Sequence, residues 1–500
     1  MKAVKLFLSA SLLAFVFFSC DNRQDDSNDV PTIEKKVTLT QEEFLSIAFD
    51  NPKELSEQDI QFVIKMFEIT LNKEILVKNN LVNASYNAKE KYYLSLDGKK
   101  RFASKSEANS SEIVPIYRYD LIQNTDTGFV FVSADERFPS VLAYVPKGDL
   151  NKKDDASVFA GIEMMLELSE ESLLNNIKYF NHLKDSLRDH TLEKISKELE
   201  INVSEVAYNK VRDNLIVEGK PATKSIVIPQ LSGTLGQIGP LVTTKWGQGQ
   251  PYNYQIAEGC DEFIMGTDYV SHYPAGCLVT AAAQVLAHIQ PAMQVTRVNG
   301  QSVTINWSQL KQTPSIEPGW SYFSGVPASE QNRIDMVSGL IKHIFNGTST
   351  TPNCDGSSTV LNSMWTCLNS KISMGSSASG MNVTTVKSSL DAMKIVLAGG
   401  VRNKGTANAG SHAWIIDGYA ICIKGVNTVI SASSNVSTKE LVNNYDLFLH
   451  ANMGWEGTGD GYYYVNSNLT ITFDPNVNLN NDGNYNYNSD FWFRPNLTSK

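Results

Sequence analysis

Cys277 is the residue of this chain whose type and position point most directly to chemistry. It begins a stretch with apolar residues at helical spacing, bounded by Pro274 and Gly276 in front and by Pro291 behind. A thiol on the first turn of a helix lies at the positive end of the helix dipole, which lowers its pKa and favours the nucleophilic thiolate. The alternative interpretation is a small buried cysteine that caps a core helix, since buried free cysteines are common.

A base for this thiol is found in His412, which opens an apolar, strand-like run 135 residues after Cys277. An imidazole facing the Cys277 helix could take the thiol proton and later protonate a leaving amine. His272, in a polar turn before that helix, is an alternative base, although a base needs a rigid mount. His288 shares the helix with Cys277 but lies about 16 Å along it, which is too far. The remaining histidines are predicted to be solvated or structural: His182, His190, His343 and His450.

Four motifs follow one another along the second half of the chain. They are WGQGQPYN at 246–253, GCLVTAAAQ at 276–284, HAWIIDGY at 412–419 and NMGW at 452–455, with INW at 305–307 between them. In this order they resemble the streptopain family of cysteine proteases, and the resemblance covers about residues 225–470. The order of cysteine and histidine, and the gap between them, are also those of papain-like proteases. The resemblance implies a papain-like fold and an endopeptidase that is made as a zymogen.

The resemblance assigns roles to four side chains. Cys277 matches the family nucleophile and His412 the general base and acid. Gln248 matches the side chain that, with the Cys277 backbone N–H, holds the oxyanion, which needs donors aimed at its oxygen. Asn452 matches a polar group that orients the histidine. Met453 departs from the family pattern Asn-Trp-Gly-Trp, so an adaptable apolar side chain replaces a flat indole beside His412.

The predicted fold class is α+β. The catalytic domain, residues 225–500, is expected to be papain-like, with a helical half bearing Cys277 and an antiparallel sheet bearing His412. Residues 35–224 resemble an inhibitory propeptide with its own α+β fold; the alternative is an ordinary binding domain. Local patterns in this region predict a capping box at 39–43, strands at 128–132 and 141–145, and a charged helix over 156–198.

Between the two domains, residues 217–240 are rich in Gly and Pro, with Lys220 and Lys224. This composition predicts an exposed linker in which activation cleavage falls. The Asn-rich segment after about residue 470 has no functional interpretation.

The N-terminus has the pattern of a targeting segment. Lys2 and Lys5 precede a 13-residue apolar stretch, 6–18, which is too short to span a membrane. Residues 17–20 resemble a bacterial lipoprotein box, so 1–20 would be a lipoprotein signal and Cys20 the lipidated residue; the alternative is an ordinary secretory signal. Residues 21–34 are expected to form an acidic, flexible tether. The protein is therefore expected to be exported, anchored by lipid at the outer membrane or cell surface, or otherwise secreted.

Composition and motif content argue against several classes of partner and cofactor. The 500-residue chain has a net charge of −10 and no basic patch, which argues against nucleic-acid partners. No Walker motif, His-Glu-x-x-His motif or closely spaced cysteine pair is found, so neither a metal nor an organic cofactor is expected. The expected partners are protein or peptide substrates and the chain's own propeptide. The alternatives to an endopeptidase are a non-catalytic surface-binding lipoprotein and a thiol acyltransferase or amidase.

Five cysteines remain besides Cys20, an odd number for an exported protein. One free thiol is therefore expected, and Cys277 is the candidate. Cys354 and Cys367 could form a disulfide, which the sequence does not decide, and a chain with all five thiols free is also compatible with the family.

Overall fold

The structure is a computed structural model that describes thirteen stretches of the chain. They are residues 35–49, 52–71, 85–96, 101–104, 112–123, 126–150, 156–218, 237–264, 267–316, 327–402, 410–423, 445–465 and 491–500. The predicted signal and tether with Cys20, residues 219–236 of the linker, and most of the Asn-rich segment lie outside them, so these predictions stay predictions. Within the described stretches, no helix is both long enough and apolar enough to cross a membrane.

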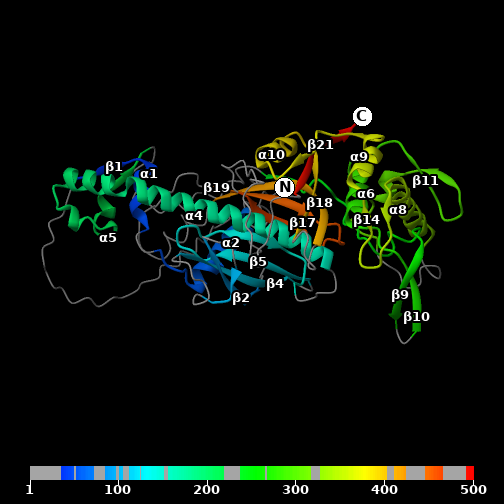
Figure 1. Ribbon diagram of the computed structural model, residues 1–500, viewed down its shortest axis with the longest axis horizontal. Helices are drawn as coiled ribbons and strands as arrows, with labels where there is room; N and C mark the ends of the chain where they lie inside the picture. Colours follow the sequence, from blue (N-terminus) through cyan, green and yellow to red (C-terminus); the bar gives the residue numbers. More distant parts are fainter. Residues whose placement is uncertain are drawn as a thin grey trace, which may run out of the picture.

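One antiparallel sheet runs through both halves of the chain (Figure 1). Strands β6 and β20 join the two halves, with Tyr144 opposite Tyr462 and Ala143 opposite Tyr463. The main path follows β15 (Ile372–Ser373), β21 (Trp492–Ser499), β17 (Ile395–Arg402), β18 (Gly410–Ile423), β19 (Tyr445–Asn452), β20 (Gly461–Val465), β6 (Val141–Val145), β5 (Asp126–Ser133), β4 (Ile113–Gln123), β2 (Ser85–Ser95) and β3 (Arg101–Phe102). Two short strands lie off this path: β16 (Ala378–Ser379) pairs with β21, and β8 (Gln237–Ile238) pairs with β18.

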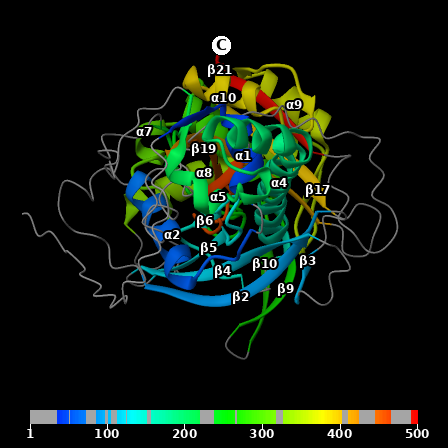
Figure 2. The ribbon, with the colours of Figure 1, turned by 90° about the vertical axis from the view of Figure 1, so that its left-hand side faces the viewer.

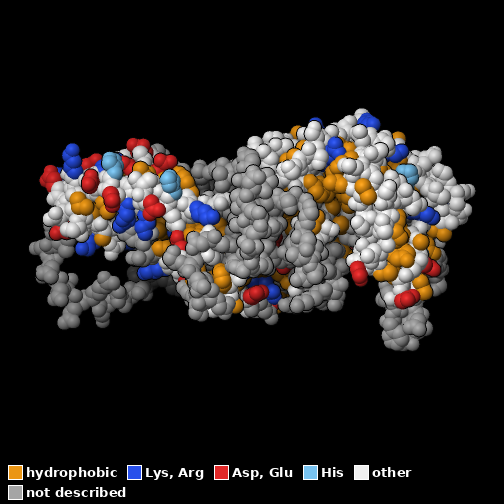
Figure 3. All heavy atoms as spheres, viewed as in Figure 1, with side chains coloured by type: hydrophobic (Ala, Val, Ile, Leu, Met, Phe, Trp, Pro, Cys, Tyr) orange, Lys and Arg blue, Asp and Glu red, His pale blue; other side chains and the backbone are white. Residues whose placement is uncertain are grey.

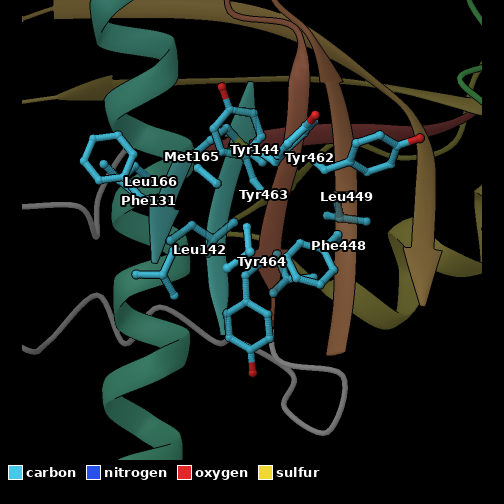
Figure 4. Packing of buried hydrophobic residues seen from close by; sticks show 14 of the residues in the cluster. Phe131, Leu142, Tyr144, Met165, Leu166, Phe448, Leu449, Tyr462, Tyr463 and Tyr464 are labelled. Carbon is cyan, nitrogen blue, oxygen red and sulfur yellow. The ribbon is translucent and has the colours of Figure 1, made fainter. Parts of the chain in front are cut away.

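The long helix α4 (Ala156–Leu199) packs along one face of this sheet, against β6, β17, β18 and β20. Helices α2 (Glu57–Leu71) and α10 (Val383–Asp391) lie on the same core. Figure 4 shows that side chains of β5, β6 and α4 interleave there with those of β19 and β20. The predicted strands at 128–132 and 141–145 and the predicted helix over 156–198 are confirmed.

The far end of α4 carries a small core of its own. It is formed with β1 (Val37–Leu39), α1 (Gln41–Ala48), α5 (Tyr208–Val211) and β7 (Leu215–Val217), and β1 and β7 pair in parallel. The predicted capping box is confirmed, because the Thr40 side chain accepts from Glu43 N while the Glu43 carboxylate accepts from Thr40 N. Figure 2 is viewed from this end, and Figure 3 shows acidic and basic side chains intermixed over it.

The helical half of the predicted catalytic domain packs on the other face of β17 and β18. Its central helix is α6 (Cys277–Ile289), and its core also takes in residues from α8 and α9. The remaining elements are α7 (Trp307–Leu310), α8 (Ala328–Gly347), α9 (Leu361–Asn369) and the hairpins β9 (Glu258–Ile264) with β10 (Thr267–His272), β11 (Gln294–Thr296) with β12 (Ser302–Thr304), and β13 (Thr350–Thr351) with β14 (Ser358–Thr359). A helical half bearing Cys277 against an antiparallel sheet bearing His412 is thus observed, and the α+β fold class is confirmed.

Candidate active site

Cys277 is the first residue of α6, and the backbone just before it leaves no room for a side chain. Gly276 has a φ of 84°, a conformation that favours glycine. A Cβ at this position would lie 2.4 Å from the carbonyl oxygen of Ser357. Beyond its first residue the helix is buried through Ala287, as its apolar spacing predicts. Cys277 therefore sits at the end of a rigid helix, beside the loop that contains Ser357.

The Cys277 thiol is half-buried, and its surroundings do not favour the thiolate in this arrangement. Burial raises the pKa of the thiol, while hydrogen bonds with the backbone of Ala413, Leu278 and Cys277 itself lower it. The net pKa lies above the ordinary value of a cysteine. The lowered pKa expected from the helix dipole is therefore wrong for this state, because the loss of water outweighs the favourable backbone groups.

His412 lies on β18 and is almost fully buried. Its Nε2 is 2.9 Å from the carbonyl oxygen of Met453, so Nε2 carries the proton and donates it there. Its Nδ1 finds no partner among the described residues. Burial lowers the pKa of His412 to about 4, and the Met453 carbonyl offsets part of that effect. The imidazole is therefore neutral at pH 7.

His412 and Cys277 lie on opposite faces of β18. Successive strand residues alternate between faces: Ala413 and Ile415 belong to the core around α6, whereas Trp414 belongs to the core under α4. The His412 ring stacks beside the Trp414 ring, with centroids 6.2 Å apart and planes at 12°. No hydrogen bond joins His412 to Cys277 among the described residues. The expectation that the imidazole faces the Cys277 helix is wrong for this state, because the ring lies on the α4 side.

The first turns of α4 cover His412. A Cβ at Gly161 would lie 2.4 Å from Cδ2 of the imidazole and 3.2 Å from its Nε2, so the helix backbone is in contact with the ring. The Ala160 methyl group lies 3.0 Å from where Gly410 would place a Cβ. Because α4 belongs to the predicted propeptide, this contact links that region directly to the candidate base.

We expect Gly161→Ala to destabilise the precursor, although glycine to alanine inside a helix normally stabilises by about 0.5–1 kcal/mol. The added methyl group has no room beside His412, so either α4 or the imidazole must move. Thermal unfolding should show a lower Tm than the parent protein, measured in a Cys277→Ala background that cannot process itself.

Gly347→Ala at the end of α8 is the matched control. Its added Cβ would meet Cys367 Sγ at 3.7 Å, an ordinary contact. An increase in Tm for Gly161→Ala as large as any increase for the control would contradict a tight α4–His412 contact.

Gln248 lies in a loop that contacts the segment just before Cys277. Its side chain is 2% exposed, and its Nε2 finds no acceptor in the described parts of the chain. Its backbone oxygen accepts from Ala275 N at 2.9 Å, two residues before the thiol. The Gln248 amide nitrogen is therefore a buried donor with no acceptor among the described residues, an arrangement that costs free energy.

Asn452, at the end of β19, makes no hydrogen bond with His412 in the part of the chain that the structure describes. Its Oδ1 accepts from Gln284 Nε2 at 3.0 Å and from Gly454 N at 3.2 Å, and its Nδ2 donates to Thr244 O at 3.0 Å. In this state Asn452 therefore does not orient His412 through a hydrogen bond, and its expected orienting role in an active enzyme stays a prediction. Instead the backbone oxygen of the neighbouring Met453 holds His412, and the Met453 side chain is fully buried.

His450 forms a buried pair with Asp417 that the sequence analysis did not predict. Its Nδ1 lies 2.6 Å from Asp417 Oδ1, and the other Asp417 oxygen accepts from Val242 N. Burial alone would lower the pKa of His450, but Asp417 raises it above the ordinary value. The pair anchors the chain just after the linker. Asp417 lies in the 412–419 motif, and its position in an otherwise apolar run was the available signal.

His272, the alternative base, is the last residue of β10 rather than part of a turn. Its Nδ1 lies 2.6 Å from the Ile256 carbonyl oxygen, which holds the ring in a structural contact.

Cys260 and Cys354 form a disulfide across 94 residues of sequence. Cys277, Cys367 and Cys422 are free. The pairing of Cys354 with Cys367 is therefore wrong, and so is the expectation of one free thiol. The disulfide ties β9 to the loop that leads to Ser357, which lies against Gly276. Among the described residues, no group of three or more potential ligands could hold a metal ion.

The chain is similar to a known protein family and to solved structures. The model of the Peptidase C10 family matches residues 246–463. A solved structure of a prointerpain A fragment from Prevotella intermedia is 15% identical, covering 83% of this chain and all of that one, with a TM-score of 0.41. Active interpain A cysteine protease from the same organism is 17% identical, covering 54% of this chain and 99% of that one, with a TM-score of 0.33. Among curated proteins, no significant match is found.

Proposed function

Because residues 246–463 belong to the Peptidase C10 family, we propose that this chain is a cysteine endopeptidase made as a zymogen. The matched range contains all four motifs on which the resemblance to the streptopain family rests, and that resemblance is confirmed. The observation that carries the proposal is the placement of Cys277 at the start of α6, close in sequence to Ala275, which binds the backbone of Gln248. The amide nitrogen of Gln248 has no acceptor among the described residues.

In the proposed reaction, the Cys277 thiolate attacks the carbonyl carbon of a peptide bond. The Gln248 amide and the Cys277 backbone N–H stabilise the oxyanion. His412 takes the thiol proton and gives it to the leaving amine, which leaves an acyl-enzyme. Water, activated by His412, then releases the second product. No metal or organic cofactor takes part.

The structure supports a latent state for this machinery. His412 lies on the α4 face of β18, its Nε2 donates to the Met453 carbonyl, and its ring occupies the space that a Cβ at Gly161 would need. We propose that residues 35–224 act as the inhibitory propeptide, and that the β18 backbone around His412 rearranges to bring the imidazole to Cys277 once α4 has been withdrawn. Residues 237–238 are paired with β18, so the cut that permits the propeptide to leave is expected in 219–236. The predicted boundary at 224/225 stays a proposal.

The test is to treat purified protein with trypsin, which can cut after Lys224, and to assay casein hydrolysis with and without a thiol-directed covalent inhibitor. Inhibitor-sensitive hydrolysis that appears after trypsin supports the proposal, with trypsin blocked before the assay. No hydrolysis would favour the non-catalytic lipoprotein. Transfer of the acyl group to an added amine, in place of hydrolysis, would favour the acyltransferase.

Replacing Gln248 with alanine is expected to lower kcat by about 10²–10³-fold, the usual loss for one oxyanion donor. KM should change much less, because the oxyanion exists in the transition state rather than in the bound substrate. Steady-state kinetics on a peptide substrate measure both quantities. An effect confined to KM would make Gln248 a substrate-binding residue instead.

For localisation we propose lipid anchoring through Cys20 at the outer membrane or cell surface. Cys20→Ser is expected to release the protein from the membrane fraction, because the lipid would be its attachment to the membrane. Fractionation followed by immunoblotting measures the distribution. If the variant stays with the membrane as the parent does, the attachment point lies elsewhere.

A further inference from the structure

Gln284 lies on the same face of α6 as Cys277, two turns further along and about 10 Å away. Its side chain is fully buried and uses both ends of its amide. Oε1 accepts from Trp246 N at 3.1 Å, and Nε2 donates to Asn452 Oδ1 at 3.0 Å. The Gln284 side chain therefore joins its own helix, which begins at Cys277, to the loop that carries Gln248 and to Asn452 at the end of β19.

The direction of these hydrogen bonds is fixed by their partners. The Trp246 backbone N–H can only donate, so the Gln284 oxygen must face it. Asn452 Nδ2 donates to the Thr244 carbonyl, so its oxygen must face the Gln284 nitrogen. Neither amide can be flipped without leaving a buried group unpaired, a loss that weakens any buried polar network. The connection is thus specific for a glutamine at position 284.

The loop that carries Gln248 is pinned to the α6 segment at two points. Gln284 binds the backbone N–H of Trp246, and the Ala275 N–H binds the backbone oxygen of Gln248. Between these two points the chain has little freedom to shift along the helix. The height of the Gln248 amide relative to the Cys277 thiol is therefore set by Gln284 on one side and by Ala275 on the other.

We infer that Gln284 is a positioning residue for the oxyanion hole, acting through Gln248. The inference rests on the proposed peptidase function. A displacement of about 1 Å in a catalytic group can lower a rate by about 10²-fold. Gln284→Met keeps the size of the side chain but removes both hydrogen bonds, so kcat is expected to fall by about 10–100-fold with little change in KM.

The matched control is Gln255→Met. Gln255 also uses its amide, through Nε2, on the Asp335 carbonyl and the buried Ser338 hydroxyl, which both belong to α8. The decisive measurement is a double-mutant cycle on the activated enzyme. Gln248→Ala should lower kcat by about 10²–10³-fold in the parent but far less in the Gln284→Met background, since the amide there is already misplaced.

Two results would overturn the inference while leaving the peptidase function in place. One is an equal kcat for Gln284→Met and Gln255→Met; the other is an undiminished effect of Gln248→Ala in the Gln284→Met background. An activated parent enzyme without peptidase activity would overturn both proposals together.

Gln284→Glu keeps the experiment decisive if Gln284→Met does not fold. Burial raises the pKa of a carboxyl group, and a protonated carboxyl group at this position again offers one acceptor and one donor. The kcat of Gln284→Glu relative to the parent should therefore rise as the pH falls. A ratio that does not change with pH would contradict the positioning role.

Discussion

Replacing Cys277 with alanine is expected to abolish peptide hydrolysis, with a loss of about 10⁶-fold or to below detection. The proposed chemistry has no other nucleophile at the start of α6. His412→Ala should have a similar effect, and the double variant should be no worse than either single one, because the two groups act as a unit. Casein hydrolysis by the trypsin-treated protein measures the loss, and circular dichroism verifies folding.

Cys367→Ala is the control for the loss of a thiol as such. Cys367 is also free and half-buried, but it lies on α9 and has no role in the proposed reaction. Its replacement should leave hydrolysis intact. Substantial activity in a folded Cys277→Ala protein would end the proposed mechanism, whatever the behaviour of the control.

The full-length chain is expected to be nearly inactive, and a single cut in 219–236 is expected to leave the two parts together. One continuous core lies across the boundary: Leu142 and Tyr144 of β6 pack with Phe448 of β19 and Tyr463 of β20 (Figure 4). Burying this much apolar surface holds the parts together without a covalent link. Activity should therefore rise only as residues 35–218 are digested or dissociate, and α4 leaves His412.

A specific protease site placed in 219–236 separates these two steps. After the cut, size-exclusion chromatography should show both fragments in one peak, and peptide hydrolysis should stay near the precursor level. The chromatography is repeated with the Cys277→Ala protein, in which self-digestion cannot separate the two fragments. Full activity at the moment of cutting, with α4 still bound, would show that the contact between Gly161 and His412 does not enforce latency.

Much of this architecture could be predicted from the sequence because its signals are local. The start of α6 follows from a glycine turn and an apolar stripe, and the Thr40–Glu43 capping box lies within a single helical turn. Strands β5 and β6 and the helix α4 are each marked by their own periodicity. The order of the four motifs then indicated the family, and with it the pairing of a cysteine helix with a histidine strand.

The state of the site could not be predicted, because it depends on contacts between distant segments. Alternation along β18 allows the His412 side chain to lie on either of two faces of the sheet. In the structure it lies on the face toward α4, where Gly161 packs against the ring. That contact joins residues from opposite halves of the chain. Likewise, nothing in the spacing of the cysteines distinguishes a partner for Cys354 at 260 from one at 367, since many pairings are compatible with one sequence.

The disulfide and the proposed catalytic thiol place opposite demands on the redox conditions around this protein. Cys277 must stay reduced to act as a nucleophile, whereas the loop beside Gly276 is tied to β9 by an oxidised pair, Cys260 and Cys354. A reductant that regenerates the thiol also attacks the disulfide by exchange, and an oxidant that protects the disulfide drives the thiol toward sulfenic acid. The proposed enzyme therefore works in a window of intermediate redox potential, in which Cys277 stays reduced while the disulfide between Cys260 and Cys354 stays intact.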